Sequence, residues 1–377
     1  MLLSRICLLL SLIFIRSVDG AVSKSTPVKF HNQKSFGKRK VHGSNTIPTP
    51  VKTAIVITNR LKVLLDESAD HKVPPASLAK LATLYILFQC LKNGSITLRT
   101  KFKVSKNASL QIPSKLGLLP GSTISVLDCI CALTVKSAND VAVVVAEGIA
   151  GSTEKFCRLM NQMAVRVGMK NTNFKNPSGL FEPGQMTTAR DLAMLGLALC
   201  RDFPEYLHYL SMKAFKFGQN TYPTHCKILH WCSAVDAAKT GYVRQSGFNL
   251  FVTTENHLTK ERVIVVVMGW NAPKQRDMYA ARLLSTYTRP RSGVGRLPMM
   301  RQIRASFYAQ VGNQSLLGTP AITSKGQRPI PSAPVKSIDI VQQDDEVELT
   351  AEELDKWYKD DVVVETEAPV EIGAPQM

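Results

Sequence analysis

Apolar periodicity changes twice along this chain of 377 residues. Two short strand-like runs, at 54–58 and 61–65, are separated by two residues, which predicts a β-hairpin with a two-residue turn. Helix-spaced apolar residues fill the middle of the chain, and two further strand-like runs follow at 248–255 and 262–269. This order predicts a sheet whose two edges come from the two ends of the ordered region, with a cluster of helices between them.

The middle section divides at glycine and proline residues into separate predicted helices. The first begins at Ser77, directly after Pro74-Pro75, and its apolar run ends before Asn93-Gly94. A closing helix is predicted at 272–288. Four amphipathic helices are predicted between these two, at roughly 125–134, 140–149, 154–167 and 188–200.

Both ends of the chain differ in composition from this ordered region. Residues 1–20 contain an early arginine, an apolar run over 6–15 and small or polar residues after it, which is typical of a secretory signal peptide. An uncleaved membrane anchor is the alternative, although the apolar run is shorter than the ~20 residues that span a bilayer. Residues 21–48 predict a basic flexible linker, 49–290 the folded domain, and 291–377 a disordered tail, Pro- and Arg-rich and then acidic.

Charge is distributed unevenly along the chain. The formal net charge is +18, yet residues 337–377, with one predicted short helix at 350–359, hold thirteen acidic side chains against two lysines. A basic body suits nucleic acid, an anionic membrane surface or anionic wall polymers. Because the first residues predict export, nucleic acid is not expected as a partner.

The cysteines exclude a fully paired disulfide framework. There are eight, and Cys7 falls in the predicted signal peptide, so an odd number remains and at least one thiol is unpaired. Cys226 and Cys232 are close enough in sequence to bridge a short loop. With His225 and His230 they form a His/Cys cluster, but its spacing matches no standard zinc pattern, so no metal is expected.

Ser77 and Lys80 are the first candidate catalytic pair. If a helix begins near Ser77, residues three apart share one face, so the hydroxyl and the amine could exchange a proton. Serine needs an adjacent base, and lysine can be that base once burial or nearby cations lower its pKa. Ser35 and Ser152 also precede a lysine by three residues, and such a match is usually only a helix cap and a surface charge. Ser77 alone follows a hairpin and heads a strongly apolar helix.

Two later motifs add polar groups that could line the same cleft. Ser137 and Asn139 flank one residue between two predicted helices, whereas the rival Ser-x-Asn match at 105–107 lies in a polar loop without flanking helices. The tripeptide Lys239-Thr240-Gly241 comes shortly before the strand-like run at 248–255. A cation, a hydroxyl and a glycine suit carboxylate recognition and close approach of the backbone to a substrate, although an ordinary turn would use similar residues.

The three motifs occur in the order Ser-x-x-Lys, Ser-x-Asn and Lys-Thr-Gly, separated by 60 and 102 residues, which is the motif set of the penicillin-recognising serine enzymes. Over roughly residues 50–290 the chain resembles the D-alanyl-D-alanine carboxypeptidases, the low-molecular-mass penicillin-binding proteins. Segments that are similar to this family are Pro-Ala-Ser-Leu at 75–78, the central stretch at 119–121, 125–128 and 136–140, Asn-Pro-Ser-Gly-Leu at 176–180 with the helix start at 187–192, and the substrate strand at 239–242 with 247–250.

The resemblance implies a serine β-lactamase/transpeptidase-like fold of the α/β (α+β) class, with an antiparallel sheet flanked by helices and an all-helical subdomain. It also implies a role for each motif residue. Ser77 would attack the penultimate D-alanine carbonyl, Lys80 would accept its proton, and Ser137 would relay a proton. The substrate-binding roles would fall to Asn139 for the substrate amide, Lys239 for the electrostatics of the cleft, Thr240 and Arg276 for the terminal carboxylate, Gly241 on the substrate strand, and Tyr242, whose N–H would form the oxyanion hole with that of Ser77.

The implied reaction is removal of the terminal D-alanine from peptidoglycan pentapeptides, without a cofactor, in the bacterial periplasm or cell envelope. β-Lactam antibiotics would be covalent inhibitors. Two features depart from the family pattern. Ala79 stands where the family usually has threonine, and the usual C-terminal β-domain and amphipathic membrane helix are not evident in 290–377, which leaves membrane association open.

Three alternatives use the same motifs. A D,D-endopeptidase that cleaves peptidoglycan cross-links would need the same catalytic residues, so the sequence does not separate it from a carboxypeptidase. A catalytically silent wall-binding relative would keep the fold, although every motif residue is present. A class A β-lactamase needs a deacylating glutamate between Ser137 and Lys239, and no glutamate in that interval has the expected context.

Overall fold

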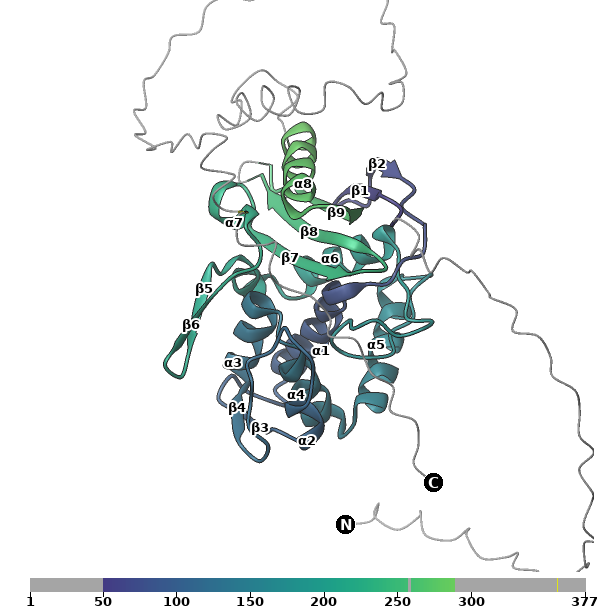
Figure 1. The fold of residues 1–377 in the computed structure, drawn as a ribbon. Coiled ribbons are helices and arrows are strands. Elements are labelled where there is room, and N and C mark those ends of the chain that lie inside the picture. Colours follow the sequence, from purple (N-terminus) through teal and green to yellow (C-terminus); the bar gives the residue numbers. More distant parts are fainter. Residues whose placement is uncertain (1–49, 257–258, 289–357, 359–377) are drawn as a thin grey trace, which may run out of the picture. The chain divides into compact units, whose positions relative to one another are not determined.

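The computed structural model describes residues 50–256, 259–288 and 358. A five-stranded antiparallel sheet has the strand order β2-β1-β9-β8-β7, so the N-terminal hairpin pairs directly with the last strand (Figure 1). The bounds of these strands are Thr53–Thr58 for β1, Val63–Glu67 for β2, Ala237–Val243 for β7, Gly247–Glu255 for β8 and Arg262–Trp270 for β9. The antiparallel sheet is confirmed, and its two edges come from opposite ends of the described chain, as the sequence predicts.

The hairpin of β1 and β2 is confirmed, but its predicted two-residue turn is wrong. Four residues, 59–62, connect the strands, and Leu61 adopts a positive φ of 61°. A tight two-residue hairpin turn favours glycine or asparagine at both central positions, and Arg60 does not meet that requirement. The Thr58 N–H instead donates to the Lys62 carbonyl at 3.0 Å and closes the wider loop.

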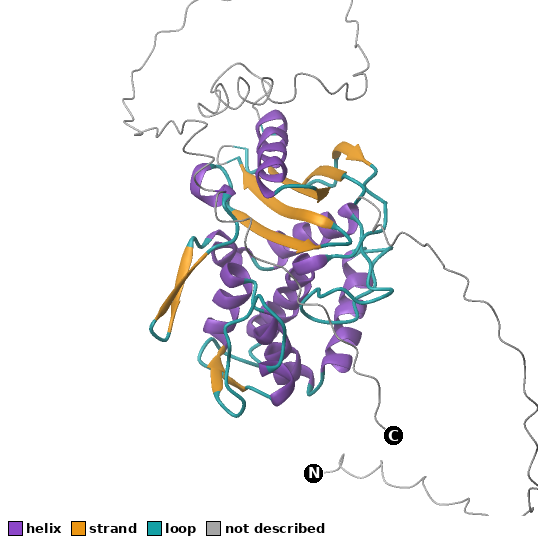
Figure 2. Ribbon diagram, in the orientation of Figure 1, coloured by secondary structure: helices purple, strands orange, loops and turns teal. Residues whose placement is uncertain are grey.

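Both faces of the sheet are covered, which explains the nearly continuous apolar sequence of β9. Alternate β9 residues point to opposite faces: Ile264 and Val266 join the core shared with the helical subdomain, whereas Val265 and Val267 join a smaller core. That smaller core packs under α8 (Pro273–Tyr287) and α7 (Ile228–Trp231). Figure 2 shows the sheet between α8 and the larger group of helices.

The helical subdomain follows the predicted pattern closely. Its main helices are α1 (Lys80–Lys92), α3 (Val126–Cys131), α4 (Asn139–Ala150), α5 (Thr153–Val167) and α6 (Ala189–Asp202), with the π-helical turn η2 (Ala132–Lys136) after α3 and the 3-10 segment η3 (Pro204–Ser211) after α6. Two small hairpins, β3 (Lys101–Lys103) with β4 (Thr123–Ser125) and β5 (Ala214–Phe217) with β6 (Asn220–Pro223), complete the fold. Among the described residues, no helix combines the length and apolar character that crossing a bilayer requires.

Two local predictions need correction. The α-helix after Ser77 starts at Lys80, because Ser77 lies in the 3-10 turn η1 (Ala76–Ala79) that follows the two prolines. Ser105 is not in a plain loop, since its hydroxyl accepts from the Ala108 N–H and caps the short helix α2 (Lys106–Ser109). The Lys-Thr-Gly tripeptide lies within the strand β7, as the resemblance to a substrate strand implies, and not in the ordinary turn that was the alternative.

Some predictions lie outside the described residues. These are the signal peptide over 1–20, the linker over 21–48 and the tail over 291–377 apart from Tyr358.

Candidate active site

The pair Ser77 and Lys80 meets as the spacing predicts. Lys80 is fully buried, and its Nζ lies 3.0 Å from Ser77 Oγ. The same nitrogen donates to two carbonyl oxygens, Asn139 Oδ1 at 2.8 Å and the main-chain oxygen of Ser178 at 2.7 Å. The 3-10 turn and the first turn of α1 therefore place the hydroxyl on an amine that neighbouring loops hold in position.

Asn139 reaches Lys80 because of an unusual turn before α4. Ser137 adopts left-handed backbone angles, φ 58° and ψ 37°, between η2 and α4. A non-glycine residue in this region costs on the order of 1 kcal/mol or more and is found most often at functional sites. Asn139 is held on its other side too. Its side-chain Nδ2 donates to the Ile112 carbonyl at 3.0 Å, and its main-chain N–H donates to the Ser114 carbonyl at 2.7 Å.

The loop containing Ser178 contributes the main-chain oxygen that accepts from Lys80, a contact that the sequence motifs do not predict. Its Asn176 side chain accepts from the Gly179 N–H at 2.8 Å, and Gly179 has a φ of 87°. A Cβ on Gly179 would lie 1.8 Å from the Ala76 carbonyl oxygen, so only glycine allows the loop to pack against the turn that holds Ser77. The asparagine and glycine in 176–180 predict a tight turn, but not that its carbonyl would face a lysine.

Lys239 forms a second buried lysine–serine contact. It is 1% exposed on β7, and its Nζ donates to Ser137 Oγ at 2.8 Å and to the Thr240 carbonyl at 2.9 Å. Burial, which disfavours the ammonium form, and to a smaller extent the Arg276 charge lower the pKa of Lys239 to about 8. This contact joins the helical turn of Ser137 to the edge strand of the sheet.

Gly241 lets the strand β7 run close to the main chain at Ser77. A Cβ on Gly241 would lie 3.1 Å from the backbone nitrogens of Ser77 and of Leu78, tighter than ordinary side-chain contacts. The next residue, Tyr242, packs its ring against Phe248 with the ring centroids 4.4 Å apart. The two residues predicted to supply the oxyanion hole, Ser77 and Tyr242, therefore belong to segments in close contact.

Arg276 lies at the start of α8 and is 3% exposed. Its Nε donates to Asp277 Oδ1 at 2.7 Å, and its Nη1 lies 3.4 Å from the Asn249 carbonyl. Among the described residues these are its hydrogen-bond partners, so the structure does not join it directly to Thr240. It is nevertheless near the cleft, because its charge acts on Lys239.

The His/Cys cluster at 225–232 is not assembled into a site. Cys226 and Cys232 are both free thiols, so the bridge that the sequence allowed does not form. Within the part of the chain that the structure describes, no three His, Cys, Asp or Glu side chains gather to hold a metal ion.

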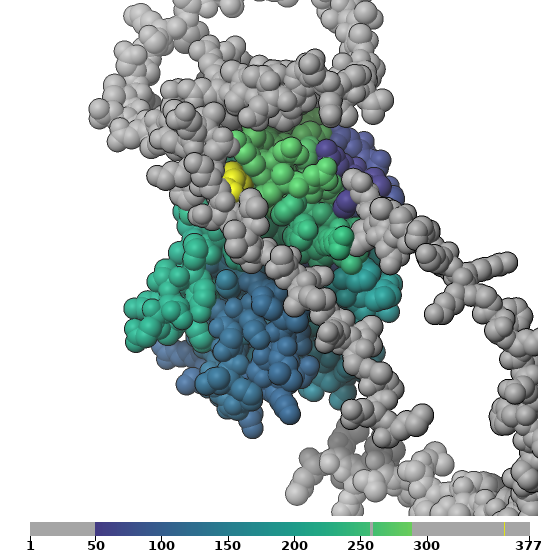
Figure 3. Space-filling model, in the orientation of Figure 1, coloured from purple at the N-terminus to yellow at the C-terminus, as the bar shows by residue number. Residues whose placement is uncertain are grey.

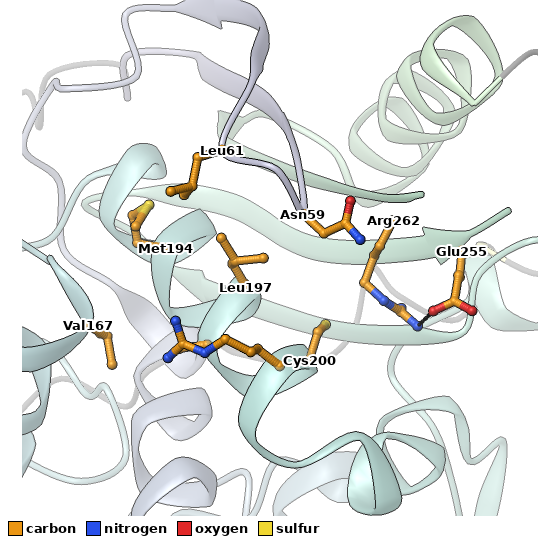
Figure 4. Close-up of a pocket in the computed structure, with 10 residues that line it drawn as sticks. Asn59, Leu61, Val167, Met194, Leu197, Cys200, Glu255 and Arg262 are labelled. Carbon is orange, nitrogen blue, oxygen red and sulfur yellow. Dashed lines mark hydrogen bonds and ion pairs between the residues drawn. The ribbon is translucent and has the colours of Figure 1, made fainter. Parts of the chain in front are cut away.

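A separate pocket of about 340 Å³ lies at another part of the sheet and contains none of the motif residues (Figure 4). Leu61, Met194 and Leu197 are among its apolar lining residues, and Arg262 reaches Glu255 at its polar end, with Nη2 and Oε2 2.9 Å apart. The carboxylate compensates the arginine charge there, so we assign this pocket no part in the chemistry.

Comparisons with known proteins agree with the motif geometry. Residues 45–272 match the family described as D-alanyl-D-alanine carboxypeptidase. The D-alanyl-D-alanine carboxypeptidase DacC of Escherichia coli is 37% identical over 233 residues, which cover 59% of this chain and 57% of the relative. DacA of Haemophilus influenzae is 34% identical and aligned over 60% of this chain and 61% of its own length. This chain thus spans less than two thirds of the length of these relatives.

The fold has solved counterparts as well. The crystal structure of penicillin binding protein 5 from Haemophilus influenzae is similar with a TM-score of 0.60 and 33% identity, over 62% of this chain and 69% of that one. This likeness supports the fold that the motif resemblance implies.

Proposed function

Because the chain belongs to the D-alanyl-D-alanine carboxypeptidase family, we propose that it removes the terminal D-alanine from peptidoglycan pentapeptides through an acyl-enzyme on Ser77. The observation that carries this proposal is the buried Lys80 amine, 3.0 Å from the Ser77 hydroxyl and held by two carbonyl oxygens. Export to the bacterial cell envelope, predicted from residues 1–20, is part of the same proposal.

The hydrogen bonds of Lys80 favour its role as the base. The oxygens of Asn139 and Ser178 can only accept, so an uncharged amine uses its two N–H bonds on them. Its lone pair then faces Ser77 Oγ and takes the hydroxyl proton as the oxygen attacks the penultimate D-alanine carbonyl. A tetrahedral oxyanion forms, and the N–H groups of Ser77 and Tyr242 stabilise it, each contributing about 3 kcal/mol.

Collapse of this intermediate breaks the peptide bond and leaves an ester on Ser77. The departing D-alanine nitrogen takes a proton through the Ser137 hydroxyl, which Lys239 holds at 2.8 Å. Water then hydrolyses the ester and restores the serine. The hydroxyl of Thr240 and the guanidinium of Arg276 bind the terminal carboxylate, and Lys239 adds positive potential at the same place. β-Lactams, whose strained amide takes the place of the peptide bond, acylate the same serine.

Assays with two purified substrates test the proposal. D-Alanine release from a pentapeptide ending in D-Ala-D-Ala is measured beside cleavage of cross-linked muropeptide dimers, with the Ser77→Ala variant as the control. We expect the wild-type protein to release D-alanine and the variant to be inactive. Cleavage of dimers alone would instead identify a D,D-endopeptidase, and inactivity on both substrates would indicate a wall-binding relative without catalysis.

A further inference from the structure

Tyr358 stands far along the chain from the rest of the described residues, yet its side chain is only 8% exposed (yellow in Figure 3). Its hydroxyl donates to Asp277 Oδ2 at 2.8 Å and accepts from Trp231 Nε1 at 3.1 Å. Trp231 closes α7 and Asp277 lies in the first turns of α8, so the tyrosine links the two helices that cover the outer face of the sheet.

The other oxygen of the same carboxylate holds Arg276. Asp277 Oδ1 accepts from Arg276 Nε at 2.7 Å, and Asp277 is fully buried. Arg276 in turn reaches the carbonyl of Asn249, the residue that pairs with Gly241 between β8 and β7. A continuous set of hydrogen bonds therefore runs from Tyr358 to the strand pair that carries the Lys-Thr-Gly motif.

We propose that Tyr358 is a positioning residue for Arg276: its hydroxyl occupies one oxygen of Asp277, so the arginine pairs with the other through Nε alone. This inference rests on the proposed function, in which Arg276 binds the substrate carboxylate. Its consequence is that Tyr358, although remote in sequence from the motifs, sets how firmly the enzyme holds the terminal D-alanine.

The physical reason lies in how arginine pairs with a carboxylate. A guanidinium beside a free carboxylate prefers a two-pronged contact that uses Nε and one Nη group. With Tyr358 on Oδ2, a second arginine nitrogen would have to share that oxygen with the phenol, and Nη1 instead faces the Asn249 carbonyl at 3.4 Å, on the side of β8 and β7. Without the hydroxyl, Asp277 would draw a second nitrogen toward itself and take it from the substrate.

Tyr358 is suited to remain a hydrogen-bond donor. Burial raises the pKa of its phenol, and the neighbouring Asp277 carboxylate raises it further. The hydroxyl therefore keeps its proton throughout the pH range in which the protein would work.

Thermal unfolding of the full chain tests the docking of Tyr358 independently of activity. We expect Tyr358→Phe to lower Tm by about 4 °C, because it leaves the buried groups of Trp231 and Asp277 without this partner. Trp231→Phe should lower Tm as well, and the double variant should add little to either change. Tyr279→Phe is the matched control, since it removes a hydroxyl that binds Glu67 at 2.7 Å on the exposed side of the same helix. Equal Tm for Tyr358→Phe and Tyr279→Phe would overturn the docking.

Kinetics with a D-Ala-D-Ala peptide and its C-terminal amide test the positioning. We expect Tyr358→Phe to raise KM for the free acid about fivefold, with kcat and the rate on the amide nearly unchanged. Tyr279→Phe should keep the wild-type preference for acid over amide. An active Tyr358→Phe variant with the wild-type preference would overturn the positioning role. Absence of D-alanine release from both wild type and Tyr279→Phe would refute the proposed function and this role with it, while the unfolding data still decide the docking.

Discussion

Two cations lie beside the edge strand β7, and their charges are handled in opposite ways. Arg262 belongs to β9, and its side chain is 12% exposed; it pairs at 2.7 Å with Asp236, the residue before β7, and Glu255 reaches the same guanidinium at 2.9 Å. Lys239 lies within β7 and is 1% exposed, and it donates to the neutral oxygens of Ser137 and Thr240. The first charge is therefore compensated by carboxylates and the second is not.

The pKa values follow this difference. Burial opposes the charge of Arg262, yet nearby acidic groups, Asp236 among them, raise its pKa overall. At Lys239 burial outweighs the opposing effect of Cys226, and no carboxylate adds to it, so the pKa falls to about 8. A buried cation with carboxylate partners contributes to structure, whereas one without them creates positive potential for a bound anion. We therefore expect substitutions of Arg262 to affect mainly stability and substitutions of Lys239 to affect mainly activity.

Exchanging lysine and arginine should give the largest contrast. Lys80→Arg should reduce the rate of acylation by penicillin about 10³-fold or more, because a guanidinium does not lose its proton near neutral pH. Arg262→Lys, the reverse exchange at the compensated cation, should leave that rate within about threefold, since it keeps a positive charge between Asp236 and Glu255. Stopped-flow measurement with a fluorescent penicillin gives both rates. Comparable losses of acylation rate in the two variants would show that compensated and uncompensated cations do not differ in function.

Removing the charge of Lys239 should reduce activity, whereas removing the charge of Arg262 should reduce stability. Lys239→Gln should lower kcat/KM for a D-Ala-D-Ala peptide about 10²-fold with little loss of stability, because a buried cation without a carboxylate partner is removed. Arg262→Gln should lower the free energy of unfolding by about 1–3 kcal/mol, since Asp236 and Glu255 then face each other without a cation, and kcat/KM should barely change. Urea unfolding beside the peptide assay checks both. A Lys239→Gln protein that is unstable but fully active would reverse our assignment.

Gly241→Ala should have a smaller effect on acylation, confined to the contact between β7 and the turn that holds Ser77. The added methyl would meet the backbone nitrogens of Ser77 and Leu78 at 3.1 Å, so the main chain must shift by a few tenths of an ångström. We expect acylation to slow about tenfold. Gly218→Ala is the control. It has open space around it, and although its φ of 59° strains an alanine, that strain falls in the separate hairpin of β5 and β6, so the variant should acylate at the wild-type rate. Wild-type acylation by Gly241→Ala would argue against close contact between β7 and Ser77.

The pH profile should show the smallest change, a decline of a few-fold within about half a pH unit above the pKa of Lys239. Because the pKa of Lys239 is about 8 in the folded protein and 10.5 as its ordinary value, the unfolded chain binds more protons between these pH values. Its burial therefore opposes folding below pH 8, and this cost is lost as the pH rises toward 10.5. The positive potential disappears in the same window, so kcat/KM should fall above pH 8. Lys239→Arg should retain its activity to higher pH, and an unchanged alkaline limb in that variant would exclude Lys239 as the titrating group.

Much of this arrangement could be predicted from the sequence, because local patterns decide it. Apolar periodicity located the five main helices and the strands β1, β8 and β9. The motif spacing selected Ser77, Lys80 and Lys239 as candidates, and the fold brings each lysine to a motif serine. The start of α1 was placed three residues early, since the 3-10 turn depends on contact with the Gly179 loop rather than on propensity. The strand β7 is indicated only by the family resemblance and not by a periodic pattern, because its residues Lys239–Gly241 lack apolar alternation and are buried by tertiary contacts.

Other features depend on contacts between distant segments and left no local signal. The Ser178 carbonyl that binds Lys80 is a backbone atom 98 residues away, and any residue type could supply it. Tyr358 falls within the short helix predicted at 350–359 of the acidic tail, but its buried site exists only because Trp231 and Asp277 come together in the fold. Sequence patterns report which groups are present, whereas such contacts are set by the tertiary structure.

Mass spectrometry of the protein after reaction with penicillin tests most directly whether Ser77, activated by Lys80, is the nucleophile. We expect one covalent adduct per chain, located by peptide mapping on Ser77, absent from Ser77→Ala and present in Ser152→Ala, which alters the other Ser-x-x-Lys match within the described residues. An adduct on a different residue, or one that persists in Ser77→Ala, would contradict the mechanism.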